Sequence, residues 1–207
     1  MNRFKYTLFS VLLLVLSQSQ TMAQDYFPLK ENSLYYYTAT YNNLVFHDTI
    51  QLKKYSENNA TCFYFHVVSD FGTGVDLIES GLFLGTYFRS GDSLFFINAT
   101  DLEELKGKGK DQGQLVMTFP LIIGQSHQVK AYDGDSTFIN ITGFENVSIS
   151  GGTFKKCAMV ERISFVNGFR FSTDLFWLAP DVGIVKIERL SGRKEELSGY
   201  KFSGKKK

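Results

Sequence analysis

The side chains of this sequence that could bind a metal ion are few and far apart. Its three histidines, His47, His66 and His127, form neither an HxH nor an HExxH pair, and each lies in a stretch with strand character. Three strand histidines can converge on Zn²⁺ inside a barrel, but no spacing in this chain favours that arrangement. The sequence therefore predicts no metal ion and no other cofactor.

The two cysteines, Cys62 and Cys157, each lie within an apolar stretch. In an oxidising compartment two cysteines can form a disulfide, but a thiol inside a strand also packs as a small hydrophobic group. No histidine lies near Cys157 in the sequence to activate it as a nucleophile. We expect two buried thiols, with a Cys62–Cys157 disulfide as the alternative.

Paired acids and a glycine–lysine run are the remaining candidates for catalysis or phosphate binding. Asp133 and Asp135, like Glu103 and Glu104, fall in turn-like or solvated positions. Residues 107–110 read Gly-Lys-Gly-Lys but lack both the Walker spacing and a following helix. Because G-x-S-x-G and H-E-x-x-H are also missing, we predict no catalytic residue. The alternative is a hydrolase whose site assembles from distant positions.

Residues 1–23 have the pattern of a secretory signal peptide. Arg3 and Lys5 form a positively charged start, an apolar run follows, and small residues lead up to Ala23. The apolar run is too short to span about 30 Å of hydrocarbon. We expect cleavage after Ala23 and a mature chain that begins at Gln24 without a transmembrane span. The mature protein is predicted to be soluble and exported, to the periplasm or the extracellular space.

The remaining residues, 24–207, have the composition of a single all-β domain. The chain contains 20 Phe and 11 Tyr, which favour strands over helices, and no Pro/Ser-rich linker divides it. Basic and acidic residues nearly balance, at 22 Lys and Arg against 21 Asp and Glu. Nucleic acid is therefore not an expected partner, because phosphate binding needs a clustered positive surface.

Short strand-like runs, bounded by clusters of Asn, Asp and Gly, follow one another from residue 34 onward. Asn167-Gly168 is the strongest hairpin signal, and Gly143 inside a long run predicts a bulge or a sharp bend. We expect about eleven strands, with a short segment at 101–105 as the one helix candidate. Because the connections are too short for parallel crossovers, the predicted fold is all-β: an antiparallel curved sheet, a half-barrel or a barrel.

The single tryptophan, Trp177, comes just before a tight turn. Pro180 presets the first corner of this turn, and Gly183 can adopt a positive φ. Large aromatic side chains beside such turns are usually buried. We therefore predict that Trp177 is a core residue, with a ligand platform as the alternative.

Residues 119–126, 143–157 and 177–186 carry three motifs, among them GTFKKC and WLAPDVGIVK. Together they resemble a family of secreted bacterial proteins of uncharacterised function related to DUF3108, through its GTFxxC and WxAPxxGxVK stretches. The resemblance implies a curved antiparallel sheet or half-barrel, like the lipoprotein-carrier proteins of the periplasm. It implies no known activity, and a fold alone does not supply one.

Residues 61–68 are apolar on both faces, whereas a simple open sheet leaves one face polar. This pattern favours an exported, non-enzymatic β-domain. Such a domain would hold an apolar, lipid-like or amphipathic small molecule, or a protein partner, in the concave face of its sheet. Besides the hydrolase, an outer-membrane barrel is a third possibility. It is disfavoured by adjacent lysine pairs, Lys53-Lys54 and Lys155-Lys156, which place a charge on each face.

Overall fold

The computed structural model describes five stretches of the chain: residues 24–57, 60–70, 86–97, 113–130 and 135–203. The predicted signal peptide, the helix expected at 101–105 and the glycine–lysine run at 107–110 lie outside these residues. Within the described stretches, no helix is long and apolar enough to cross a membrane.

The described residues form one sheet of twelve strands in which paired neighbours are antiparallel. The strands follow the order of the chain, except where β12 pairs with β1. The predicted antiparallel all-β fold is therefore confirmed. The strands are β1 (Leu34–Tyr41), β2 (Leu44–Glu57), β3 (Ala60–Asp70), β4 (Thr86–Ser90), β5 (Ser93–Ile97), β6 (Gln114–Thr118), β7 (Ser126–Lys130), β8 (Ser136–Ile149), β9 (Gly152–Val166), β10 (Phe169–Ala179), β11 (Gly183–Arg189) and β12 (Lys194–Lys201).

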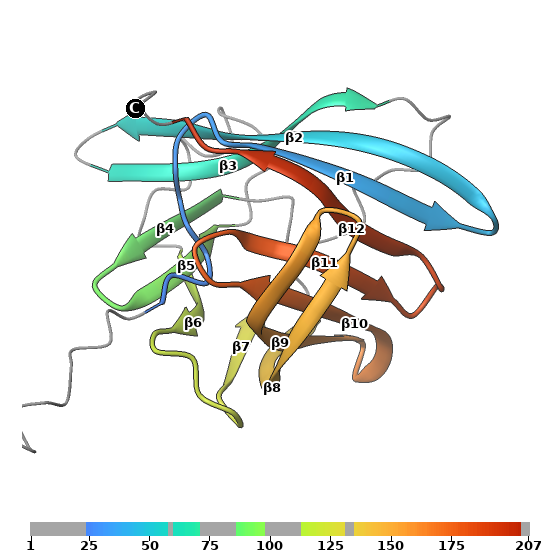
Figure 1. The fold of residues 1–207 in the computed structure, drawn as a ribbon. Coiled ribbons are helices and arrows are strands. Elements are labelled where there is room, and N and C mark those ends of the chain that lie inside the picture. The colour runs from blue at the N-terminus through green and yellow to red at the C-terminus, as the bar shows by residue number, and fades with distance from the viewer. Residues whose placement is uncertain (1–23, 58–59, 71–85, 98–112, 131–134, 204–207) are drawn as a thin grey trace, which may run out of the picture.

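The two edge strands, β6 and β7, lie beside each other and nearly close the sheet into a barrel (Figure 1). Gln125 bridges this seam, because its side-chain amide donates a hydrogen bond to the backbone oxygen of Thr118 at 3.0 Å. Gln125 is also held by β8, since the backbone N–H of Ile141 donates to its carbonyl at 2.9 Å. A side chain therefore joins the two edges of the sheet.

Because the strands run up and down, the connections alternate between the two ends of the barrel. We call one end the strap end, after the N-terminal strap described below. Of the described connections, it carries those that follow β4, β6 and β10, while the β8–β9 turn lies over β12. We call the other the network end, after a buried ion network. There the turns after β1, β9 and β11 point the same way, to the right in Figure 1.

The long hairpin of β8 and β9 folds back over the outside of the sheet, across β12 (Figure 1). Its ladder shifts register at Gly143, which is the predicted bulge. At its turn, a Cβ on Gly151 would lie only 2.2 Å from the backbone oxygen of Leu197, so this approach requires glycine. Glu145 of β8 accepts a hydrogen bond from the indole N–H of Trp177. Trp177 is 5% exposed, which confirms its predicted core position.

Two apolar clusters account for the strands that are apolar on both faces. The main cluster fills the barrel, and Tyr87 and Phe176 are its largest fully buried side chains. A second cluster contains Cys62, Phe88 and Ile97. Because side chains alternate along a strand, this second cluster lies on the opposite face of β3, β4 and β5. The two-sided pattern therefore reflects burial on both faces of these strands.

Both turns predicted from the sequence have the backbone that they need. Asn167 and Gly168 have φ values of 49° and 80°, the positive pair that a type I′ hairpin turn requires. Between β10 and β11, Asp181 and Gly183 also have positive φ, at 61° and 99°. These tight turns hold long neighbouring strands in register.

Candidate functional site

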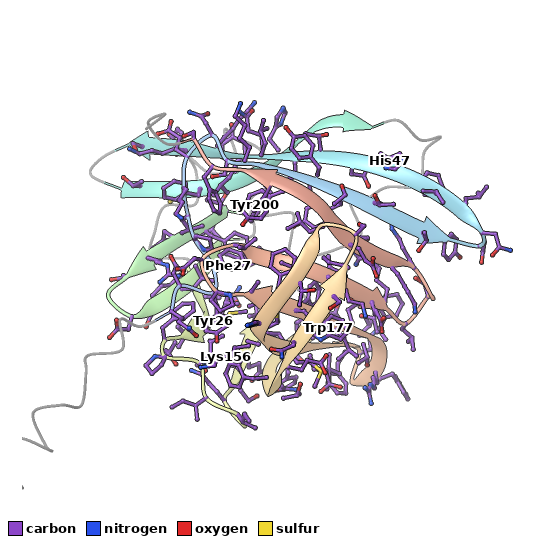
Figure 2. The ribbon with its side chains drawn as sticks, in the orientation of Figure 1. Tyr26, Phe27, His47, Lys156, Trp177 and Tyr200 are labelled. Atoms are coloured by element: carbon purple, nitrogen blue, oxygen red, sulfur yellow. The ribbon has the colours of Figure 1, made fainter. Side chains whose placement is uncertain are left out.

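Residues 24–33, the N-terminal strap, run across the strap end of the barrel before β1 begins (Figures 1 and 2). The carbonyl of Asp25 accepts a hydrogen bond from the backbone N–H of Asp181, in the β10–β11 turn, at 2.7 Å. The Tyr26 hydroxyl donates to the carbonyl of Lys156, in β9, at 3.0 Å. The first part of the strap is thus tied to two separate hairpins.

The second part of the strap joins the opposite side of the barrel. The backbone N–H of Asn32 donates to the carbonyl of Leu52 at 2.7 Å, and the N–H of Leu52 donates to the carbonyl of Ser33 at 2.9 Å. After β12, the Ser203 hydroxyl donates to the carbonyl of Glu31 at 2.6 Å. The strap therefore spans the barrel end from β9 and β10 to β2.

Phe27 is the side chain that the strap sends into the barrel. Only 2% of its surface is exposed. Its ring centroid lies 5.0 Å from that of Tyr87 and 6.0 Å from that of Phe65. Pro28 follows and packs near Gly183, where an added Cβ would lie 3.5 Å from the proline ring. An aromatic ring of the strap thus completes the aromatic interior at this end.

Arg89, on β4, holds the strap at the rim. Its Nη2 donates to the Asp25 carboxylate and, at 3.0 Å, to the carbonyl of Phe27. Its guanidinium lies 4.3 Å from the ring centroid of Phe119. Its Nε–H is buried and has no hydrogen-bond partner among the described residues. A guanidinium can bind a carboxylate through two parallel N–H groups, so Arg89 keeps a donor that the strap does not use.

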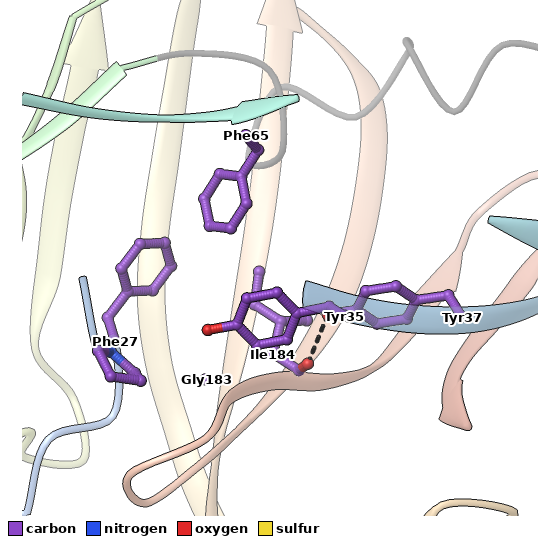
Figure 3. Close-up of a pocket in the computed structure, with 7 residues that line it drawn as sticks. Phe27, Tyr35, Tyr37, Phe65, Gly183 and Ile184 are labelled. Carbon is purple, nitrogen blue, oxygen red and sulfur yellow. Dashed lines mark hydrogen bonds between the residues drawn. The ribbon is translucent and has the colours of Figure 1, made fainter. Parts of the chain in front are cut away.

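A small pocket lies between the strap and the barrel interior (Figure 3). It has room for about one water molecule. Inside it, the Tyr37 hydroxyl donates to the carbonyl of Ile184 at 2.7 Å. Burial raises the pKa of Tyr35 and of Tyr37 well above the ordinary tyrosine value, so both hydroxyls stay neutral. The pocket is lined by Phe27, Pro28, Tyr35, Tyr37, Phe65, Gly183 and Ile184.

Six charged side chains form a buried ion network at the other end of the barrel. Glu195 is 1% exposed and lies at its centre, 2.9 Å from Arg193 Nε and 3.0 Å from Arg189 Nη2. Arg189 Nη1 also lies 4.0 Å from Asp174, which pairs with Arg162. The three acids and three arginines balance in charge; they are Asp48, Asp174, Glu195, Arg162, Arg189 and Arg193.

The three histidines lie on separate strands, His47 on β2, His66 on β3 and His127 on β7. In the described stretches, no group of three His, Cys, Asp or Glu side chains is placed to hold a metal ion. The structure thus gives the histidines no common site. His47 lies near the Thr38 hydroxyl, at 3.4 Å, in an exposed position.

The two cysteines lie in different apolar clusters, Cys62 in the second and Cys157 in the main one. Both are buried, and no disulfide joins them. Burial raises the pKa of the Cys157 thiol from 9.0 to about 11. A thiol held protonated in this way is a poor nucleophile, as expected from its strand position.

Of the four paired acids noted in the sequence, the structure describes Asp135. Asp133, Glu103 and Glu104 lie outside the described residues. Asp135 is half-buried and accepts a hydrogen bond from the backbone N–H of Asn167 at 3.2 Å, which is a structural role at a hairpin turn.

Neither Arg89 nor the strap was singled out in the sequence. The strap has no periodic pattern, and Arg89 is one ordinary strand arginine among many charged residues. The ion network did leave a signal, because Asp174 lies at the same strand parity as the buried Phe176 and Leu178. A charge on the apolar face of a strand indicates a buried ion pair.

No family model and no curated protein matches the sequence. Among solved structures, the fold is similar to the crystal structure of a “putative lipoprotein” from Parabacteroides distasonis ATCC 8503, with a TM-score of 0.43 and 12% sequence identity. The similarity covers 86% of this chain and 99% of that chain. The resemblance to the DUF3108-related family stays a hypothesis.

Proposed function

We propose that this chain is an exported, non-enzymatic β-domain that binds an amphipathic carboxylate, a molecule of the fatty-acid class, beneath the N-terminal strap. The observation that carries the proposal is the way the strap itself is held. The Asp25 carboxylate lies on Arg89 at the rim, and the Phe27 ring lies among aromatic rings inside the barrel. A free carboxylate with an apolar body offers the same two groups.

Such a ligand would have to displace the strap. Small-molecule pockets usually enclose about 300–1,000 Å³, whereas the space beneath the strap holds about one water molecule. Exposing Phe27 costs about 1.5–3 kcal/mol, and each buried methylene of a ligand returns about 0.8 kcal/mol. A long acyl chain therefore offsets the cost. The proposed site is at the strap end, whereas the sequence analysis expected the ligand in the concave face of the sheet.

Two further parts of the proposal rest on the sequence. Export to the periplasm or the extracellular space rests on the signal-peptide pattern of residues 1–23. Kinship with the DUF3108-related proteins rests on the three motifs, and two of these, residues 143–157 and 177–186, contain the strap contacts Lys156 and Asp181. The motifs that carry the resemblance therefore help to build the proposed site.

Titration with a fluorescent fatty acid and with its methyl ester tests the proposal. In Asp25→Asn the strap keeps the side-chain oxygen that accepts from the Phe27 N–H but loses its charge on Arg89. Because the competing carboxylate is gone, the acid should bind about two- to fivefold more tightly than it binds the original protein. The neutral ester must displace the same, more weakly held strap, so its affinity should rise by a similar factor, and the preference for the acid over the ester should stay nearly unchanged.

Arg89→Met should remove the preference for the acid over the ester, because the carboxylate loses its partner. The matched control is Arg170→Met, which removes an arginine whose side chain is 56% exposed at the network end. This control should keep the preference. If the original protein and Asp25→Asn bind neither probe, the fatty-acid proposal is wrong. The protein partner predicted from the sequence would then be the remaining hypothesis.

A further inference from the structure

The turns of the network end expose large apolar side chains. Leu190 in the β11–β12 turn is 70% exposed, and Phe169 and Phe171 at the start of β10 are 79% and 70% exposed. The surfaces of soluble proteins carry scattered exposed apolar residues, but a cluster of them marks an interaction site. We call this group the apolar fringe; its members are Leu44, Val45, Val166, Phe169, Phe171 and Leu190.

The fringe residues form a row. In the sheet, β2, β1, β12, β11, β10 and β9 are consecutive neighbours, so their three connecting turns lie side by side at one end. Figure 1 shows these three turns projecting together to the right. With strands about 4.8 Å apart, neighbouring tips are roughly 10 Å from each other. The fringe is therefore a line of separate convex tips.

Exposed basic side chains accompany the fringe. The side chain of Arg170 is 56% exposed and that of Lys194 is 57% exposed. Two acids, Glu161 and Glu188, are less exposed, and each is paired with one of these bases, at 3.8 and 3.5 Å. The three acids of the ion network are buried. Asp135, at the β9–β10 turn, is a third acid; it is half-buried and accepts a hydrogen bond from the Asn167 N–H. Among the described residues, Arg170 and Lys194 are therefore more exposed than the acids near them.

We propose that the apolar fringe inserts into the surface of an anionic lipid bilayer. Convex tips spaced along a row fit a fluid surface, which closes around each side chain, better than they fit the flat or concave face of a folded partner. Aromatic and aliphatic side chains gain free energy in the interfacial region, and nearby Arg and Lys attract anionic headgroups. This inference does not depend on the fatty-acid site, which lies at the opposite end of the barrel.

Sedimentation of the mature chain with vesicles of phosphatidylcholine and phosphatidylglycerol tests the inference. The Phe169→Ser/Phe171→Ser double variant should lose vesicle binding by on the order of tenfold or more, since two exposed rings no longer insert. The matched control is Ile122→Ser/Ile123→Ser. These two residues are 63% and 62% exposed, in the β6–β7 connection at the strap end, and the control should bind vesicles like the original protein.

Charge supplies a second arm of the experiment. Arg170→Gln/Lys194→Gln should lose the preference for phosphatidylglycerol vesicles over pure phosphatidylcholine vesicles, and added salt should have the same effect. Equal losses in the fringe variant and the Ile122/Ile123 control would overturn the inference. The inference would also be overturned if the original protein does not bind vesicles but self-associates in solution, and if the fringe variant loses that self-association. The fringe would then be an interface between copies of the chain.

Discussion

Trp177 lies between two layers of the same sheet, and its contacts come from both. The indole N–H donates to Glu145 on the folded-back β8, and the Lys186 ammonium lies 4.5 Å from its ring centroid on β11. The side chain is 5% exposed although it lies near the surface. Its burial therefore depends on the β8–β9 hairpin staying folded over the sheet.

Trp177→Ala should lower the free energy of unfolding by about 3–5 kcal/mol, the usual cost of truncating a buried aromatic side chain. Denaturant melts followed by circular dichroism measure the change. The matched control is Phe171→Ala on the same strand, which is 70% exposed and should change stability by less than about 0.5 kcal/mol. Equal effects in the two variants would contradict the buried position of Trp177.

The raised pKa of the buried Cys157 thiol predicts that the protein loses stability at alkaline pH. Its pKa rises from 9.0 to about 11 on folding, because burial penalises the thiolate. The unfolded chain therefore ionises this thiol first. The stabilising contribution is complete below pH 9.0 and is lost as the pH rises toward about 11.

Comparison of the original protein with Cys157→Ala over this pH range measures the effect. The unfolding free energy of the original protein should fall relative to that of Cys157→Ala as the pH rises. A constant difference between the two would contradict the prediction. Thiol titration of the unfolded, non-reduced protein is the accompanying check. It should count both of the chain's 2 cysteines, and a count near zero would reveal a disulfide.

At the scale of elements, the ion network ties together the strands of the network end. Its members come from β2, β9, β10, β11, β12 and the β11–β12 turn. Charges removed from water are stabilising only when their partners are present. The network should therefore fix how these six segments lie relative to one another.

Glu195→Gln should cost about 3–5 kcal/mol, because Arg189 and Arg193 lose their shared buried counter-charge. Glu188→Gln is the matched control on β11. Its side chain is 30% exposed, so it should cost less than about 1 kcal/mol. Thermal and denaturant melts of both variants measure the difference. A Glu195 variant as stable as the Glu188 variant would mean that the network contributes little.

The strands were predictable from the sequence because local turn residues set their boundaries. Asn167-Gly168 and Pro180 to Gly183 end and restart strands through backbone preferences that no distant contact needs to supply. The strap was not predictable, since residues 24–33 lack periodicity and take their path from contacts with Arg89, Lys156 and Asp181. Such long-range contacts are a property of the fold rather than of any one segment.

At the scale of the whole molecule, the predicted signal-peptide cleavage site lies directly before the strap. The predicted cut lies between Ala23 and Gln24, and the first strap contact with the barrel begins at Asp25. Mass spectrometry of exported material should find a chain that begins at Gln24 or within a residue or two. An exported, folded sample that still begins at Met1 would contradict the signal-peptide prediction.

The central claim is that a fatty-acid-like ligand takes the place of the strap. Hydrogen exchange of the mature chain, measured by mass spectrometry with and without saturating fatty acid, tests it most directly. Peptides that cover residues 24–33 should exchange faster when the ligand is bound, because Phe27 leaves the barrel and the bonds to Asp181 and Leu52 open. Peptides from β9 and β10 away from the strap contacts should change little. A bound ligand that leaves the strap equally or better protected would contradict the claim.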